Sequence, residues 1–295
     1  MPNGDRYEGE VVDGIRSGPG AYFWSDGYRY EGEFANDKMH GQGIYYWPDG
    51  RVFEGSFVND RREGKGALTW SNGNEYVGQF TNNAMHGKGR FVWANLDTYE
   101  GEFVEGERTG RGTYAWHTGE LYTGDFLNGV LHGNGVYVWP DGRRYAGGYR
   151  DGKRAGRGVL DEPNGNRYVG HFETDQRHGF GIFHWRDGTV YRGRFVNNRM
   201  DGFGVKSTPD GKKLFQRWEH GDLVLAQPVV AEPRCRLELD RHPWMFHSQL
   251  CINGLAHGTG VAVRLDGEAF VTNGRFVLGK MIDGEVQALT LNETP

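Results

Sequence analysis

Four histidines recur at a fixed spacing, and histidine is the side chain that most often binds transition metals or transfers protons near neutral pH. They are His40, His86, His132 and His178, each followed by Gly-x-Gly, and neighbours are 46 residues apart. If every 23 residues contain two strands, neighbouring histidines lie four strands apart, about 19 Å in a sheet. Zinc ligands lie about 2 Å from the metal. These histidines therefore cannot share an ion, and we interpret them as turn or hydrogen-bonding residues.

Other patterns that resemble catalytic or nucleotide-binding motifs are also incomplete. Gly41-x-Gly43 and its counterparts resemble fragments of a phosphate loop, but a dinucleotide fingerprint needs G-x-G-x-x-G opening a helix after a strand. Paired carboxylates such as Glu31 and Glu33 would need an enclosing pocket that shifts their pKa values before they could act as acid and base. The sequence has no nucleophile elbow, HExxH or paired CxxC motif. We therefore predict no catalytic residues, no metal and no cofactor.

The composition indicates a folded cytoplasmic protein. Among 295 residues, 49 are glycine, while 17 Phe, 15 Tyr and 9 Trp argue against disorder. An apolar run of about 20 residues, which a transmembrane helix needs, is missing, and the start MPNGDRYEGE lacks the parts of a secretory signal. A net charge of −5 gives no drive toward nucleic acid. Two cysteines, Cys235 and Cys251, are too few for a disulfide scaffold and fit a reducing compartment.

The tryptophans reveal a repeat of 23 residues. Nine in-phase units run over residues 7–213, and the second reads YEGEFANDKMHGQGIYYWPDGRV. Seven units have a tryptophan at the same position, while Glu162 and Thr208 replace it in the other two: Trp24, Trp47, Trp70, Trp93, Trp116, Trp139 and Trp185. Every unit keeps the three glycines that are Gly32, Gly41 and Gly43 in the second unit. A chain with this self-similarity is a repeat protein.

Each unit reads as two short strands, residues 30–34 and 41–47 in the second unit. Asp-Gly or Asn-Gly pairs between the units, such as Asp49-Gly50, predict type I′ turns. Because alternate residues of a strand share a face, one face gathers aromatic rings and glycines, and the rings can cover the glycine backbone. The other face is mixed and is expected to be solvated. The predicted fold is all-β: an elongated single-layer antiparallel meander of 23-residue β-hairpins with a divergent C-terminal cap.

The chain after the repeats is less regular. We assign residues 1–225 to the repeat array, with 214–225 as a decayed strand pair, and 226–295 to a linker and divergent cap. RCRLELD is predicted as a strand and HPWMFHSQLC as a short helix or a buried loop, and the repeat pattern partly returns from Leu255. An enzyme hidden in residues 234–295 would need a pocket formed by His242, His247 and Cys251.

The pattern Y-x-G-x-F…H-G-x-G-x-Y-x-W-x-D-G resembles the MORN (membrane occupation and recognition nexus) repeat over residues 7–213. The resemblance implies a non-catalytic module found in scaffolding, cytoskeletal, ciliary and membrane-apposed assemblies. It also implies two binding modes, since some MORN arrays bind phosphoinositides and others hold a partner helix in the aromatic groove. Any catalytic activity in such proteins belongs to a separate domain.

Two sets of residues are therefore the candidate sites. The partner-binding groove comprises Trp24, Tyr45, Trp47, Trp70, Trp93, Tyr114, Trp116, Tyr137, Trp139 and Trp185. The alternative is a basic rim that contacts anionic lipid: Arg16, Lys38, Arg62, Arg108, Lys153, Arg154, Arg177 and Arg199. We expect a scaffold that binds protein partners, with an amphipathic helix as the natural guest of the groove. Self-association through the open N-terminal edge or the cap is also expected, in a cytoskeletal or ciliary setting that the resemblance implies.

Overall fold

The computed structural model describes residues 4–230, 235–237, 239–247 and 251–288. These residues form β-strands and turns without a helix, which confirms the all-β prediction. The chain divides into two compact units, the first of residues 1–140 and the second of residues 141–295. We call each 23-residue element a repeat and keep the names first unit and second unit for these two parts. The predicted domain boundary at residue 225 stays a prediction.

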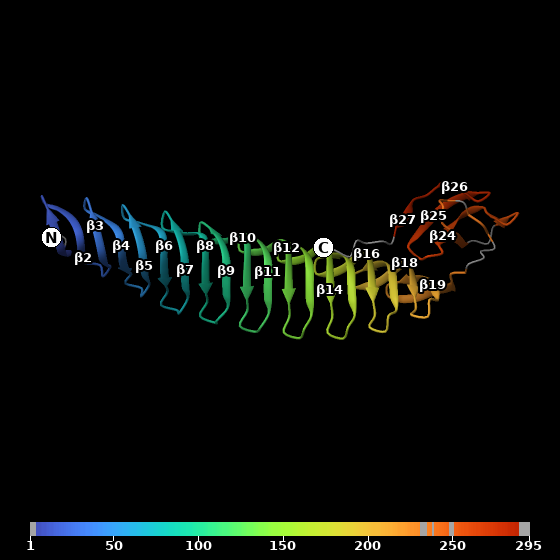
Figure 1. Cartoon of the computed structure of the whole chain (residues 1–295), viewed down its shortest axis with the longest axis horizontal. Helices are drawn as coiled ribbons and strands as arrows, with labels where there is room; N and C mark the ends of the chain where they lie inside the picture. The colour runs from blue at the N-terminus through green and yellow to red at the C-terminus, as the bar shows by residue number, and fades with distance from the viewer. Residues whose placement is uncertain (1–3, 231–234, 238, 248–250, 289–295) are drawn as a thin grey trace. The chain divides into compact units, whose positions relative to one another are not determined.

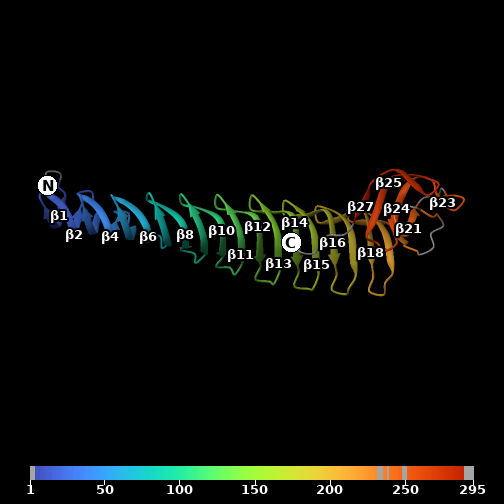
Figure 2. The same cartoon turned by 45° about the horizontal axis from the view of Figure 1, so that its top comes forward.

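In the first unit, consecutive strands pair antiparallel, so the chain forms a meander (Figure 1). Its strands are β1 (Arg6–Val12), β2 (Ile15–Phe23), β3 (Arg29–Ala35), β4 (Lys38–Tyr46), β5 (Val52–Val58), β6 (Arg61–Thr69), β7 (Glu75–Thr81), β8 (Ala84–Val92), β9 (Thr98–Val104), β10 (Glu107–Ala115), β11 (Leu121–Leu127) and β12 (Val130–Val138). The second unit begins with a meander of the same kind (Figure 2). Its strands are β13 (Arg144–Arg150), β14 (Lys153–Asp161), β15 (Arg167–Glu173), β16 (Gln176–His184), β17 (Val190–Val196), β18 (Arg199–Ser207), β19 (Lys213–Glu219) and β20 (Asp222–Pro228).

The register places aromatic rings opposite one another and glycines opposite glycines. Tyr30 faces Tyr45 and Gly32 faces Gly43 across β3 and β4. The Tyr30 ring lies flat over this glycine pair, so a Cβ atom built on Gly43 would be 2.4 Å from the ring. Its hydroxyl donates to the carbonyl oxygen of Glu33 at 2.9 Å. We call the side of the sheet that carries Tyr30, Gly32 and their equivalents the aromatic face, and the other side the opposite face.

The rings that lie over the glycine pairs contact phenylalanines of the same and the next repeat in a zigzag of T-shaped pairs. Tyr30 contacts both Phe34 and Phe57 at centroid distances of 5.1 Å, and Phe53 contacts Phe80 at 4.9 Å. All these rings are buried. Edge-to-face pairs contribute roughly 0.5–1.5 kcal/mol beyond the area they bury. A single sheet thus forms its own hydrophobic core on one face.

The turns between the repeats differ from the sequence prediction. Between repeats, Gly27 donates its N–H to the carbonyl oxygen of Trp24, and only Gly27 in the Asp26-Gly27 pair has a positive φ. Type I′ geometry, with positive φ at both central residues, occurs inside the repeats, as at Asn36 and Asp37. The prediction of type I′ turns between repeats is therefore wrong. Asparagine and aspartate tolerate the left-handed conformation, so the Asn36-Asp37 pair was the sequence signal for the turn inside the repeat.

A second sheet forms the divergent C-terminal region of the second unit and corrects two local predictions for the tail. It contains β21 (Trp244–His247), β24 (Gly258–Arg264), β25 (Ala269–Val277), β26 (Lys280–Asp283) and β27 (Val286–Ala288), and β22 (Cys251–Ile252) pairs with β23 (Leu255–Ala256). The predicted helix or loop is thus strand β21, with residues 248–250 outside the described part. RCRLELD forms no strand over its described residues, where Arg236 makes an isolated bridge to Leu255.

Cys235 and Cys251 form a disulfide whose Cα atoms are 5.5 Å apart, although we expected reduced cysteines. The sequence could not show this pairing because neither the turn at β22 and β23 nor the bridge at Arg236 follows the repeat. Cys251 is consequently no free nucleophile in this state. The alternative of an enzyme built on Cys251 loses that group.

The opposite face is solvated only in part. In the first unit it carries exposed Glu54 and Glu100, as predicted. In the second unit it becomes apolar, and Val205 of β18 and Phe215 of β19 are buried against Met245 and Val261 of the second sheet. The prediction of a solvated face is therefore wrong for β18 and β19, because the second sheet covers them.

The contact between the tyrosine ring and the glycine pair can be tested with a double-mutant cycle. All three atoms nearest to a Cβ built on Gly89 belong to the Tyr76 ring. We expect Gly89→Ala to lower the free energy of unfolding by about 1–3 kcal/mol, as overpacking does. In a Tyr76→Ala background the same substitution should cost less than about half of that. Urea unfolding of the four proteins measures both values, and equal costs in the two backgrounds would contradict the ring-on-glycine packing.

Candidate functional site: a half-buried row of aromatic rings

All ten predicted groove residues lie on or beside the aromatic face, and all are half-buried. Each tryptophan follows the last residue of a strand and is fixed by the turn; the Trp47 N–H, for example, donates to the carbonyl oxygen of Arg51 at 3.0 Å. The ring two positions earlier, such as that of Tyr45, contacts the tryptophan in a tilted arrangement at a centroid distance of 4.5 Å. The sequence spacing therefore positions these rings as expected.

In the first unit the rings form a row that we call the Trp row. It contains Trp70, Phe91, Trp93, Tyr114, Trp116, Tyr137 and Trp139, with neighbouring centroids 4.4–5.3 Å apart. A shorter run joins Tyr22, Trp24, Tyr45 and Trp47. Leu68 stands between the two runs, at the position that is aromatic in the other five repeats of the first unit. In the second unit Trp185 contacts Phe183 at 4.8 Å, and the Lys206 ammonium lies over its ring.

Five of the eight predicted rim residues have their guanidinium groups on the aromatic face. The Arg62 guanidinium lies 5.3 Å from the centroid of Trp47 and 5.5 Å from that of Phe80. It also donates from Nη2 to the carbonyl oxygen of Asn83 at 2.6 Å. Burial lowers the pKa of Arg62 from its ordinary value. Four other arginines repeat these ring and carbonyl contacts: Arg16, Arg108, Arg154 and Arg177.

The remaining rim residues, Lys38, Lys153 and Arg199, are exposed at the turns inside the units. The structure therefore separates the predicted rim into two groups rather than one basic edge. The sequence contains a signal for this separation, because arginine and methionine alternate at one repeat position. Arg62 pairs with Phe57 in the strand ladder, and Met39 holds the same position opposite Phe34 in the preceding repeat. A position shared by arginine and methionine indicates a half-buried site on an apolar face.

One hollow on the aromatic face combines both kinds of residue. Met39, Tyr45, Trp47, Phe57 and Arg62 are among the residues that line about 310 Å³ there. Such a hollow can accept an apolar side chain against the rings and an acidic group beside the guanidinium.

A buried carboxylate anchors the centre of the Trp row. Asp97 accepts the Tyr114 hydroxyl at 3.0 Å and the backbone N–H of His117 at 2.8 Å. Burial opposes its ionisation, but the hydrogen bonds from His117 and Tyr114 outweigh it and lower the pKa of Asp97 to about 2. Burial, together with the bond to Asp97, raises the pKa of Tyr114 to about 12.

Over the described ranges no three His, Cys, Asp or Glu side chains gather in a way that could hold a metal ion. Nor does the described chain contain a helix of the length and apolar character that crossing a membrane requires.

The structure defines a tandem repeat protein made of successive β-hairpins. In this protein tyrosine rings pack on paired glycines, and a row of tryptophans stays half-buried. The family model of the MORN repeat matches nine segments: residues 7–27, 30–50, 53–75, 76–98, 99–120, 122–143, 145–167, 168–190 and 191–213. The chain belongs to the MORN repeat family.

Solved structures with weak similarity include two TCP domains. The TCP domain of SAS-4 (dCPAP) from Drosophila melanogaster, in complex with a proline-rich motif of Ana2 (dSTIL), is 18% identical over 52% of this chain and 83% of that chain, with a TM-score of 0.34. The TCP10 domain of CPAP from Danio rerio, with a STIL peptide, is 16% identical over 76% of this chain and 98% of that chain, with a TM-score of 0.26. These scores support no inference about function. A search of curated proteins finds no match to this chain.

The Asp97 anchor predicts a pH dependence of stability. Its pKa is lowered on folding, from about 3.9 in an unfolded chain, so its contribution is present above pH 4 and is lost as the pH falls toward 2. We expect Asp97→Asn to lower the free energy of unfolding by roughly 1–3 kcal/mol at pH 6, with the difference from the wild type shrinking between pH 4 and pH 2. Urea unfolding of both proteins across this range measures it, and a difference that stays constant would contradict the assignment.

Proposed function

We propose that the protein is a non-catalytic scaffold that binds an amphipathic helix of a partner protein along the Trp row. The single observation that carries the proposal is the Trp row itself, a run of rings in tilted contact whose tryptophans and tyrosines the sheet leaves half-buried. Contiguous apolar surface of this kind marks interaction sites, and tryptophan and tyrosine dominate binding energies at interfaces.

The length of the row sets the length of the guest. Trp70 and Trp139 are separated by three repeats, which correspond to six strand spacings or about 29 Å. A helix rises 1.5 Å per residue, so about 19 residues would cover the row.

The arginines on the aromatic face indicate the charge of that helix. Arg108 lies beside the Trp row, over Trp93 and Tyr114, whereas Arg62 lies over Trp47 of the shorter run; both carry positive charge on the aromatic face. A helix with acidic side chains next to its apolar face would pair with them, and charge-assisted bonds to arginine are the strong class.

The lipid alternative has less geometric support. Five of the eight candidate residues have their guanidinium groups over rings on the aromatic face. A flat bilayer would have to meet this face rather than a basic edge. The cytoskeletal or ciliary setting and self-association through the edges of the sheet stay predictions.

The proposal predicts that substitutions on the aromatic face weaken the capture of a partner, whereas substitutions on the opposite face do not. We expect the triple variant Trp93→Ser, Trp116→Ser and Trp139→Ser to reduce partner capture from native lysate at least tenfold, or about 1.4 kcal/mol in binding free energy. Quantitative mass spectrometry measures the capture, and circular dichroism verifies that the variant is folded.

The matched control changes three apolar residues of the opposite face in the same unit: Ile44→Ser, Val77→Ser and Val136→Ser. This variant should capture the same proteins as the wild type. Equal capture by both triple variants would reject the Trp row as the binding surface. Binding to phosphoinositide vesicles that Arg62→Met and Arg108→Met abolish would favour the lipid alternative instead.

A further inference from the structure

The five arginines on the aromatic face differ in whether a carboxylate neutralises the guanidinium. Arg16 Nε lies 3.1 Å from the carboxylate of Asp37 in the next repeat. Hydrogen bonds from the backbone and the side chain of Arg16 lower the pKa of Asp37. Arg154 Nε lies 3.1 Å from the carboxylate of Asp175 in the same way. The positive charges of these two arginines are therefore neutralised within the chain.

Arg177 has a carboxylate neighbour of a different origin. Asn198 holds the aspartate position, and its carbonyl oxygen accepts a hydrogen bond from Arg177 Nη2 at 3.1 Å. Glu162 replaces the tryptophan of the preceding repeat. Burial lowers the pKa of Arg177, and the carboxylate of Glu162 opposes this shift. An acidic group at the tryptophan position can therefore act as the counter-ion of an arginine on this face.

Arg62 and Arg108 form no ion pair within the described part of the chain, although both side chains are half-buried. Asn83 and Gly129 hold the aspartate position, and their carbonyl oxygens accept a hydrogen bond from Nη2 at 2.6 and 2.7 Å. A tryptophan ring, rather than an acidic group, lies beside each guanidinium at 5.3 Å. These two arginines therefore differ from the other three in having no counter-ion among the described residues.

The hollow beside Arg62 shows what this difference means for binding. Its lining of about 310 Å³ includes one carboxylate, that of Asp60. Asp60 is exposed and accepts the backbone N–H of Met39 at 2.8 Å, and it forms no ion pair with Arg62. Burial and the neighbouring charge of Arg51 lower the pKa of Arg62. A cation that is partly removed from water is stabilised by a carboxylate within hydrogen-bond distance. The site therefore favours an acidic group from outside the chain.

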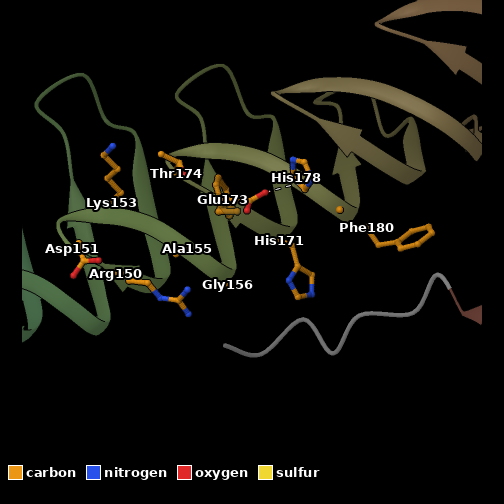
Figure 3. Close-up of a pocket in the computed structure, with 12 residues that line it drawn as sticks. Arg150, Asp151, Lys153, Ala155, Gly156, His171, Glu173, Thr174, His178 and Phe180 are labelled. Atoms are coloured by element: carbon orange, nitrogen blue, oxygen red, sulfur yellow. Dashed lines mark ion pairs between the residues drawn. The ribbon is translucent and has the colours of Figure 1, made fainter.

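A larger hollow in the second unit does not share this property (Figure 3). It has a volume of about 820 Å³, and two basic and two acidic side chains line it: Arg150, Lys153, Asp151 and Glu173. All four are exposed, and Glu173 Oε2 lies 3.5 Å from His178 Nε2. Because its charges are balanced and hydrated, this hollow has no preference for an anion.

The two arginines without a counter-ion stand at equivalent positions, two repeats apart. Arg62 lies near the start of β6 and Arg108 near the start of β10. Four strand spacings separate them, about 19 Å. Met85 holds the same position in the repeat between them. In a helix, residues eleven or fourteen positions apart point to nearly the same side and lie about 17 or 21 Å apart. One helix can therefore present an acidic side chain to each arginine.

We propose that Arg62 and Arg108 bind two acidic side chains of the partner helix, placed eleven or fourteen residues apart on one side of it. This inference rests on the proposed function, because the same helix lies on the Trp row. Each carboxylate forms a charge-assisted bond with a guanidinium, and an apolar side chain between them packs on Met85. Arg16 takes no part, since Asp37 already neutralises it. The arginines thus select a partner by the spacing of its acidic residues.

Designed peptides test this pairing with a matched control variant. The probe is an amphipathic helix of about 25 residues with leucines on one side and two glutamates fourteen residues apart beside them. We expect it to bind the wild type at least about tenfold more tightly than the same peptide with glutamines. Arg62→Met or Arg108→Met, which insert the residue of the alternate repeats, should remove most of this difference. Arg16→Met should leave it unchanged. Fluorescence anisotropy measures the Kd values, and circular dichroism verifies that the variants are folded.

A third peptide, with its glutamates seven residues apart, tests the spacing. Seven residues of helix span about 10 Å, close to one repeat, so its second carboxylate would face Met85. We expect it to bind no more than about threefold more tightly than the glutamine peptide. An affinity equal to that of the peptide with the fourteen-residue spacing would overturn the pairing of the two sites.

The remaining outcomes separate this inference from the proposed function. Equal binding of the glutamate and glutamine peptides, lost in the triple tryptophan variant, would overturn the arginine sites and leave the Trp row in place. A preference for glutamate that survives both arginine substitutions, or that Arg16→Met abolishes, would also overturn them. Binding of neither peptide to the wild type would contradict both proposals. Displacement of the glutamate peptide by phosphoinositide vesicles would assign the two arginines to lipid phosphate instead.

Discussion

The contact between a tyrosine ring and a pair of glycines is the interaction on which the rest of this structure depends. A single layer of strands has no second layer to bury its side chains, and a sheet with one exposed apolar face would aggregate. The ring lies across the glycine backbone at less than van der Waals separation from any added Cβ, as at Tyr30 and Gly43. Each hairpin therefore packs a tyrosine or phenylalanine ring within its own sheet and needs only its neighbours for stability.

This arrangement divides the aromatic face by function. Tyrosines and phenylalanines such as Tyr76 and Phe80 are buried by their T-shaped contacts and offer no surface to a partner. The tryptophans extend beyond the glycine positions, so their rings remain half-exposed. Arginines and methionines at one ladder position, such as Arg62 and Met85, fill the remaining space beside them. The surface available for binding thus consists of the side chains that the packing of the sheet does not bury.

Features that repeat with the 23-residue period could be predicted from the sequence, and features that depend on contacts outside the repeat could not. Strand pairing and the placement of Tyr30 on glycine follow from alternation and spacing, and they are confirmed. The arginines were assigned to a rim because a sequence does not show which face a bulged strand presents. The disulfide and the burial of Val205 arise from the second sheet, whose strands do not follow the period.

The alternation of arginine and an aliphatic side chain has a consequence for the register of any long guest on the aromatic face. Arg16, Met39, Arg62, Met85 and Arg108 occupy one ladder position in successive repeats. For a guest of the kind proposed, a shift by one repeat along these positions would place methionines where its acidic groups had met arginines. A shift by two repeats would bring arginines back to these groups. The arginines thus mark steps of two repeats, about 19 Å, and would favour guests whose acidic groups have the same period.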